Sequence, residues 1–286
     1  MNIQIDKAKE LGLCFGVRRA IKMLNEAVKR RGEVETLGPV AHNRQLVQGL
    51  AEIGIRAVEN LEQVQGKVLA ITTHGTSPDV LSEIQSRHIH LIDTTCPIVK
   101  RAQNSAKALA EAGFDVIIFG EAGHCEVRGL LGWAGGKGVV ALDGTGVDTL
   151  RLSHRIGVIS QTTQSQSAFV EFARKLLVAL SPRVEEMRVI NTLCRATQRR
   201  QEAAVRLAKK SQLMIVIGGY NSANTTRLAE ACSPVVETHL VETAHGVSGS
   251  WLTGKHHIGI TAGASTPDEA IEELIEKLNS LAKLVA

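Results

Sequence analysis

The sequence predicts an α/β protein made of three similar α/β units with mainly parallel sheets, arranged pseudo-threefold around a central cavity. Strand-like apolar runs alternate with amphipathic helical patterns along the whole chain, which is typical of parallel sheets. In addition, Cys14, Cys96 and Cys194 each stand where such a run gives way to a helical pattern. Because ligands bind at the carboxyl ends of parallel strands, we expect a site at these junctions.

A constant offset along the chain supports the repeat. His42 and His124 each lie 28 residues after one of these cysteines, and the same offset from the third cysteine leads to Ser222. Each unit therefore supplies one cysteine loop, one His or Asn loop and one hydroxyl-rich loop. The predicted units are residues 1–95, 96–193 and 194–286.

In the first unit, a helix is predicted after Cys14. Val17, Ala20, Leu24 and Val28 recur there on one face of a helical pattern. The other expected elements are strands over 3–5, 34–38, 68–71 and 89–92, a helix over 46–53 and a further helix before the last strand.

The second and third units follow the same plan. Continuous apolar runs predict buried strands over 116–120 and 214–218. Helical patterns follow Cys96 and Cys194, and Pro97 suits the first position of a helix. The other expected elements are strands over 156–159, 188–190 and 258–260 and a last helix after Pro267.

Composition and charge exclude several classes of protein. The net charge of +4 comes without a block of Lys and Arg, and aromatic residues make up 3%, so we expect no nucleic-acid partner. The N-terminus lacks the pattern of a signal peptide, and no apolar run approaches the roughly 18 residues of a membrane span. The five cysteines form no disulfide framework, so a reducing, cytoplasmic location is expected.

The three cysteines at strand-to-helix junctions indicate a metal centre. A lone cysteine is usually a small core residue, and we keep that interpretation for Cys125 and Cys232, which do not share the repeated position. A helix N-terminus favours the thiolate, the form that binds metal. Three thiolates can hold zinc or an iron–sulfur cluster, and an incomplete ligand set leaves a position open to substrate.

The remaining loops carry hydroxyls, amides and imidazoles in place of Lys and Arg. With the helix N-termini beneath them, such groups form a donor set for a phosphate-type anion. A single Ser or Thr would be interpreted as a helix cap, but the recurrence at matched loops favours ligands. The candidates are His42, His74, His124, Thr162, Thr163, Ser222, Asn224 and Ser265.

Glu126 is the carboxylate that these loops offer for proton transfer. It follows His124 by two residues, and a partly dry, anionic neighbourhood would set its pKa for donating a proton. The alternative is a first-turn acid that complements a helix dipole. The sequence contains no G-x-G-x-x-G or Walker pattern, so dinucleotide or ATP binding is not expected.

Nine short motifs occur in order over essentially the whole chain. They are LCFGVRRA (13–20), VAHN (40–43), THG (73–75), DTTCP (93–97), GHCEV (123–127), QTT (161–163), CRAT (194–197), NSAN (221–224) and TAGAS (261–265). Together they resemble the LytB family, the 4-hydroxy-3-methylbut-2-enyl diphosphate reductases of the methylerythritol phosphate route to isoprenoids.

The resemblance implies one [4Fe-4S] cluster bound by Cys14, Cys96 and Cys194, with the substrate hydroxyl at the fourth iron. Two electrons and two protons would remove that hydroxyl as water, giving isopentenyl diphosphate and dimethylallyl diphosphate. The electrons would come from reduced ferredoxin or flavodoxin.

The resemblance also implies roles for the loop residues. Glu126 would relay protons, Thr163 would contact the reacting end of the substrate with Thr162 beside it, and His124 would act with them. The implied diphosphate ligands are His42, His74, His124, Ser222, Asn224 and Ser265.

Two positions depart from the family pattern, and two other functions stay open. Cys125 stands where proline is usual, and Ala223 stands where some members have serine. One alternative is a zinc hydrolase with Glu126 as its base, and the other is a cluster-based redox sensor. The anion-binding loops argue against a sensor, which has no need of them. The metal content of the protein distinguishes the zinc hydrolase from an iron–sulfur enzyme.

Overall fold

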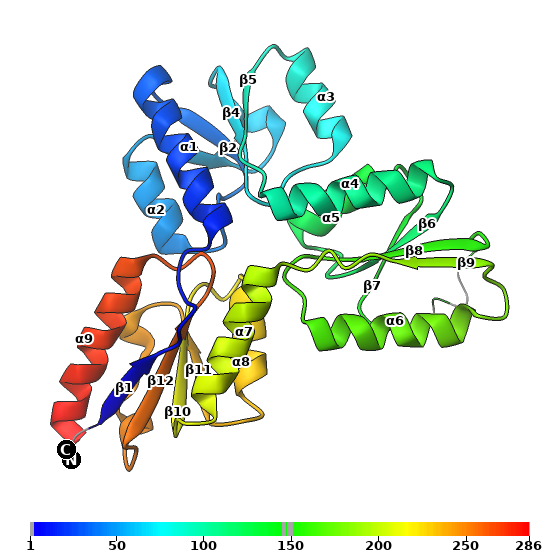
Figure 1. Ribbon diagram of the computed structural model, residues 1–286. Helices are drawn as coiled ribbons and strands as arrows, with labels where there is room; N and C mark the ends of the chain where they lie inside the picture. The colour runs from blue at the N-terminus through cyan, green and yellow to red at the C-terminus, as the bar shows by residue number, and fades with distance from the viewer. Residues whose placement is uncertain (1–2, 145–146, 148–150, 286) are drawn as a thin grey trace. The chain divides into compact units, whose positions relative to one another are not determined.

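The computed structural model describes residues 3–144, 147 and 151–285 (Figure 1). In these residues, three four-stranded sheets form, and all neighbouring strands within them are parallel. The α/β class predicted from the sequence is therefore confirmed. The arrangement of the units around a cavity stays a prediction.

The three sheets share one strand order. The strands are β1 (Gln4–Lys7), β2 (Val34–Leu37), β3 (Ile55–Val58), β4 (Val68–Ile71), β5 (His90–Asp93), β6 (Asp115–Phe119), β7 (Gly138–Ala141), β8 (Arg155–Ser160), β9 (Glu186–Val189), β10 (Leu213–Ile217), β11 (Thr238–Val241) and β12 (His257–Ala262). Two sheets have the orders β3-β2-β4-β5 and β7-β6-β8-β9. The third, β11-β10-β12-β1, repeats this order and takes its last strand from the N-terminal part of the chain.

Each predicted helix is present. The helices are α1 (Phe15–Arg31), α2 (Arg44–Glu52), α3 (Pro78–Ser86), α4 (Pro97–Glu111), α5 (Cys125–Trp133), α6 (Gln166–Leu180), α7 (Arg195–Ala208), α8 (Ala223–Cys232) and α9 (Asp268–Val285), with short 3-10 helices over 61–63, 244–246 and 249–252. Among the residues that the structure describes, no helix combines the length and apolar character that a membrane crossing requires.

The sequence analysis does not predict β3, β7 and β11. Each of them is an edge strand that pairs only with the first inner strand of its sheet. Their residues are mostly half-buried or exposed, whereas the inner strands β4 and β10 are buried throughout. Exposure alone does not explain the omission, because β7 contains the apolar run 139–141 and the equally exposed edge strands β1, β5 and β9 are predicted.

The chain divides into two compact units. The terminal unit comprises Met1–Arg18, Pro39–Ile53 and Arg195–Ala286, and the middle unit comprises Arg19–Gly38 and Gly54–Cys194. The boundaries predicted for three repeats, at residues 95 and 193, stay a prediction.

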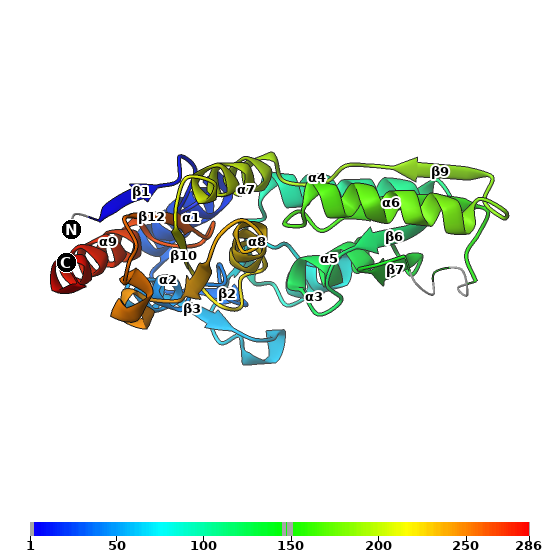
Figure 2. The same ribbon diagram turned by 90° about the horizontal axis from the view of Figure 1, so that it is seen from below.

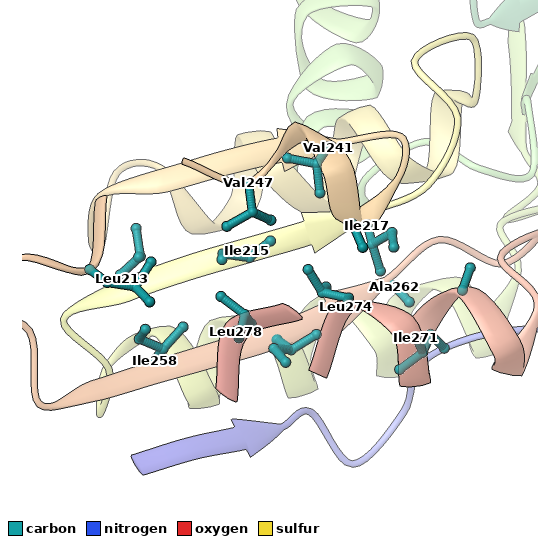
Figure 3. Close-up of a cluster of buried hydrophobic side chains, with 14 residues drawn as sticks. Leu213, Ile215, Ile217, Val241, Val247, Ile258, Ala262, Ile271, Leu274 and Leu278 are labelled. Atoms are coloured by element: carbon teal, nitrogen blue, oxygen red, sulfur yellow. The ribbon is translucent and has the colours of Figure 1, made fainter. Parts of the chain in front are cut away.

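Helices cover both faces of the sheet in the terminal unit. On one face, Leu213, Ile215 and Ile217 of β10 pack with Leu274 and Leu278 of α9 (Figure 3). The opposite face of β10 packs against α7 and α8. Figures 1 and 2 both show α9 on one side of this sheet and α7 and α8 on the other. This double cover buries the strands and leaves their carboxyl ends as the place where loops can bind a ligand.

The sheet β7-β6-β8-β9 in the middle unit has the same three layers. Val116 and Ile118 of β6 face a cluster that includes residues of α4 and α5. Ile117 and Phe119 point to the other face, where Phe119 meets the ring of Phe172 on α6 at a centroid distance of 4.7 Å. Since successive strand residues alternate between the two helical layers, the continuous apolar run of β6 is accounted for.

Candidate active site

Each of the three cysteine loops makes an equivalent backbone hydrogen bond. Each cysteine N–H donates to a carbonyl in the hydroxyl-rich loop that follows the neighbouring strand. The pairs are Cys14 with Ala264 (2.9 Å), Cys96 with Thr73 (3.0 Å) and Cys194 with Thr162 (2.9 Å). Because α1, α4 and α7 begin at the next residue in each case, the three thiols stand at helix N-termini.

The surroundings of these thiols fit a thiophilic metal group. Cys14, Cys96 and Cys194 are half-buried and are not in disulfides, and the Cys96 side chain does not cap α4. Shielded but accessible thiols at helix N-termini suit zinc or an iron–sulfur cluster, both of which the sequence leaves open. Cys232 is buried in the core with Met214 and Leu228, as predicted.

In the middle unit, His124 and Glu126 are fixed at the start of α5. His124 is the N-cap residue, and its Nδ1 accepts a hydrogen bond from the Glu126 N–H at 3.2 Å. Since Nδ1 is the acceptor, the proton of the neutral imidazole lies on Nε2, which can therefore donate to an anion. The rings of His74 and His124 meet edge-on with their centroids 5.8 Å apart.

Glu126 is a buried carboxyl group, only 2% exposed. Its two oxygens accept hydrogen bonds from the Thr162 N–H at 2.6 Å and from the Thr162 hydroxyl at 2.9 Å. Burial raises the pKa of Glu126 from 4.5 to about 7, although the two bonds from Thr162 act to lower it. A carboxyl group with this pKa can give up a proton at neutral pH, as a general acid must.

Thr163 is placed by Gln161. The side-chain amide of Gln161 donates to Thr163 Oγ1 at 3.0 Å and accepts from the Glu121 N–H at 3.0 Å. Gly120 makes room for this side chain, since a Cβ there would lie 2.9 Å from Gln161 Cβ. Because Thr163 Oγ1 accepts a bond from Gln161, its hydroxyl hydrogen can be donated to a ligand.

His74 lies in a turn that requires glycine at the next position. Gly75 has a φ of +70°, and its N–H donates to the Thr72 carbonyl at 3.1 Å. A Cβ on Gly75 would lie 2.2 Å from Gln103 Nε2, which donates to the Thr76 carbonyl. The left-handed backbone therefore favours glycine, and a larger residue would also have to displace the Gln103 amide.

In the terminal unit, close backbone contacts bring three loops together. A Cβ on Gly219 would lie 2.3 Å from the His42 carbonyl oxygen, so only glycine allows the loop after β10 to pack there. The Ser265 hydroxyl, from the loop after β12, donates to the same carbonyl at 3.5 Å. Burial lowers the pKa of His42, so its ring is neutral near pH 7 and acts through hydrogen bonds.

Ser222 and Asn224 lie at the start of α8. The Ser222 hydroxyl accepts from the Thr225 N–H at 3.3 Å and caps the helix. Asn224 is 5% exposed, and in the described part of the chain neither atom of its side-chain amide has a hydrogen-bond partner. A buried polar group without partners costs about 1–3 kcal/mol. Such an amide is expected to bind a ligand.

Cys125 occupies the first helical position of α5, where the proline that is usual in the family would also fit. Burial, followed by the charge of Glu126, raises the pKa of Cys125 to about 11. The side chain is therefore a neutral thiol near pH 7, and the thiolate that reacts or binds metal is not populated.

Three arginines contact the cysteine loops, and the sequence analysis does not single them out. They donate to backbone carbonyls in the pairs Arg19 with Thr95, Arg101 with Leu193 and Arg200 with Gly12. Their spacing is a signal in the sequence, because each follows Cys14, Cys96 or Cys194 by five or six residues.

Comparison with known proteins agrees with these observations. A family model described as LytB protein matches residues 5–279. A 4-hydroxy-3-methylbut-2-enyl diphosphate reductase of Dehalococcoides mccartyi (strain CBDB1) is 45% identical over 280 residues, which is 98% of this chain and 99% of that protein. A reductase of the same name from Geotalea daltonii is 42% identical over 282 residues, with 98% and 99% covered.

Solved structures are similar as well. A structure of (E)-4-hydroxy-3-methyl-but-2-enyl diphosphate reductase, the terminal enzyme of the non-mevalonate pathway, has 35% identity and a TM-score of 0.72, and the match covers 97% of this chain and 99% of that one. The E-1-hydroxy-2-methyl-but-2-enyl-4-diphosphate reductase from Plasmodium falciparum has 26% identity and a TM-score of 0.90, with 96% and 88% covered.

Proposed function

The chain belongs to the LytB family, and on this premise we propose how its residues carry out the reaction of that family. The chain is a 4-hydroxy-3-methylbut-2-enyl diphosphate reductase of the non-mevalonate pathway. The family named in the sequence analysis is therefore confirmed, over nearly the full length of the chain. The cofactor, the roles of the residues and the electron donor are parts of the proposal.

Cys14, Cys96 and Cys194 are the proposed ligands of one [4Fe-4S] cluster. When bound, the cluster supplies electrons and a Lewis-acid position for the hydroxyl group that leaves the substrate. The observation that supports this assignment best is the repeated loop, in which each cysteine has the same N–H bond and the same place before a helix. Zinc has no redox chemistry of its own, so it could not itself pass the two electrons of this reduction to the substrate.

Neutral hydrogen-bond donors hold the diphosphate group. In the terminal unit these are His42, Ser222, Asn224 and Ser265, of which Asn224 has its amide unengaged in the described part of the chain. In the middle unit they are His74 and His124, which lie ring to ring. The N-termini of α2, α5 and α8 add oriented backbone N–H groups that favour an anion.

Proton transfer is assigned to Glu126, with His124 and Thr163 beside it as the other catalytic residues. Burial holds the pKa of Glu126 at about 7, so the protonated form is well populated at neutral pH. Thr162 orients the carboxyl group through two bonds, and the Thr163 hydroxyl donates toward the reacting end of the substrate. The products are isopentenyl diphosphate and dimethylallyl diphosphate.

An external carrier supplies the two electrons that the reaction consumes, and reduced ferredoxin or flavodoxin is the proposed donor. A reducing cytoplasm suits the five cysteines, none of which is in a disulfide. We propose no nucleic-acid partner and no membrane partner, in keeping with the mild charge and the few aromatic residues.

Purification without oxygen tests the cofactor assignment. We expect about four iron and four sulfide per chain, a broad visible absorption band and reductive turnover with a chemically reduced dye. Cys96→Ser should lose iron and turnover, whereas the control Cys232→Ser, in the core, should keep both. An active protein with stoichiometric zinc and no iron would exclude the cluster.

A further inference from the structure

We propose that Arg19, Arg101 and Arg200 are positioning residues, each of which fixes the backbone of one cysteine loop and thereby the sulfur that the loop presents. The inference rests on the proposed function, since it gives these arginines a role toward the cluster. It goes beyond that function because these arginines are neither proposed cluster ligands nor proposed substrate-binding residues.

Arg200 gives the strongest contact. It lies on α7 in the terminal unit, is 4% exposed, and donates through Nη2 to the Gly12 carbonyl at 2.8 Å. Gly12 has a φ of +75° and stands two residues before Cys14. A buried guanidinium is costly to desolvate unless its hydrogen bonds repay the cost, so its contact with a loop backbone needs an explanation.

The middle unit shows the same contact twice. Arg101 Nη2 on α4 lies 3.3 Å from the Leu193 carbonyl and 3.5 Å from the Asn191 carbonyl, in the loop that leads to Cys194. Arg19 Nη1 on α1 donates at 3.3 Å to the carbonyl of Thr95, the residue before Cys96. Each arginine therefore contacts a carbonyl one or two residues before a cysteine, and Arg101 also contacts that of Asn191, three residues before Cys194.

The order of these contacts along the chain is regular. The arginine that follows the first cysteine holds the loop of the second, the one that follows the second holds the loop of the third, and the one that follows the third holds the loop of the first. Arg19 and Arg101 come five residues after a cysteine, and Arg200 comes six residues after one. Three occurrences of one contact at one place in a repeat are not expected from unrelated surface arginines.

The contact completes the support of each cysteine backbone. The cysteine N–H is bonded to the neighbouring hydroxyl-rich loop. The carbonyls of Cys14 and Cys96 accept the first helical bonds, from Arg18 and Lys100. Arg19 and Arg101 bind the carbonyl directly before Cys96 and Cys194. Before Cys14, Arg200 binds the Gly12 carbonyl and Arg18 binds the Leu13 carbonyl. A ligand held on all sides keeps its sulfur in place when metal binds or leaves.

Arginine suits this task better than lysine. Its planar, permanently charged guanidinium presents several N–H donors in a fixed geometry, as the two acceptors of Arg101 show. A positive charge near the ligand loops also favours electron uptake by the group that they bind. Loss of an arginine should therefore both speed metal loss and shift the reduction potential to more negative values.

The test compares Arg200→Gln and Arg200→Lys with the control Arg199→Gln. Arg199 is on the same helix and has the same charge, but its ion pair is with the Glu10 side chain and it is exposed. Iron release to a chelator is followed without oxygen, and the midpoint potential is measured by electron paramagnetic resonance. We expect release about 10–100-fold faster for Arg200→Gln, an intermediate rate for Arg200→Lys and no more than about a twofold change for Arg199→Gln.

Because Arg200 is buried, Arg101→Gln provides a variant whose folding is not at risk, since Arg101 is exposed. A several-fold faster release with unchanged melting of the metal-free protein supports positioning. Unchanged release rates and potentials in both Arg101→Gln and Arg200→Gln would overturn the inference. If the unmodified protein holds no iron at all, the proposed function fails instead, so the two failures are distinguishable.

Discussion

Two buried polar side chains, Glu126 in the middle unit and Asn224 in the terminal unit, differ in their hydrogen bonding. In the middle unit, the Glu126 carboxyl group has both oxygens engaged by Thr162. In the terminal unit, the Asn224 amide is equally buried, yet neither of its side-chain atoms has a partner in the described part of the chain. The hydrogen bonds of the first group are complete within the protein, and the proposed function assigns those of the second to the substrate.

This difference matches the two proposed roles, proton transfer for Glu126 and diphosphate binding for Asn224. A carboxyl group that is buried and held in place has a pKa set by the protein alone, and here that pKa is about 7. An amide left without partners gives up stability in the free protein and recovers it when an oxygen of the ligand arrives. Substitutions in the two units should therefore change different kinetic constants.

The largest expected effect is that of Glu126→Gln. Gln keeps the shape of the side chain but cannot donate an acidic proton, so kcat should fall by about 10²–10⁴-fold while KM changes little. The measurement is anaerobic turnover with a reduced dye, at saturating and at low substrate. Glu171→Gln, which removes an exposed carboxylate on α6, is the control. Full kcat in Glu126→Gln would show that the proton comes from elsewhere.

The same substitution should change how stability depends on pH. The pKa of Glu126 is 4.5 unfolded and about 7 folded, so between these values the folded protein binds the extra proton. Stability is then highest below pH 4.5 and falls as pH rises through 7, by about 3 kcal/mol in all. Urea unfolding of the metal-free protein from pH 5 to 8 should show this loss relative to Glu126→Gln, whose own profile lacks it.

Asn224→Ala tests the other side of the comparison. Loss of a hydrogen bond to a charged diphosphate oxygen should weaken binding by about 1.5–3 kcal/mol, which raises KM about 10–100-fold with kcat nearly unchanged. The metal-free protein should not lose stability, because the removed amide has no partner in the described structure. Calorimetric titration with the diphosphate product checks the affinity, with the exposed Asn279→Ala as control. A fall in kcat alone would contradict a binding role.

The sequence predicts those strands whose burial produces a continuous run of apolar residues. The strands β4, β6 and β10 are almost fully buried, so their apolar runs are continuous and were predicted within two residues. The edge strands β3 and β11 mix polar and apolar residues and are not predicted, and the short apolar run of β7 is not recognised as a strand either. Edge strands are set by pairing with a neighbour, which a local pattern does not contain.

The candidate site was predictable as a set of residue types but not as a geometry. The offset of 28 residues finds the helix caps His124 and Ser222, yet in the first repeat the cap is Asn43, one residue after His42. The pKa of Glu126 is raised by burial and lowered by hydrogen bonds from Thr162, 36 residues away in sequence. The arginine contacts with the cysteine loops likewise join residues 76 to 188 apart.

Thr162→Val should have the smallest effect on kcat, and it tests directly whether Glu126 is the acid. The Thr162 hydroxyl bond lowers the pKa of Glu126, whereas the backbone N–H bond remains in the variant. Loss of the hydroxyl bond should raise the pKa of Glu126. The alkaline fall in kcat should then move to higher pH, while kcat at neutral pH changes only a few-fold. The cost in stability should be about 1 kcal/mol. Since Val matches Thr in shape, a kcat profile that moves to lower pH instead would mean that a group other than Glu126 titrates in the reaction.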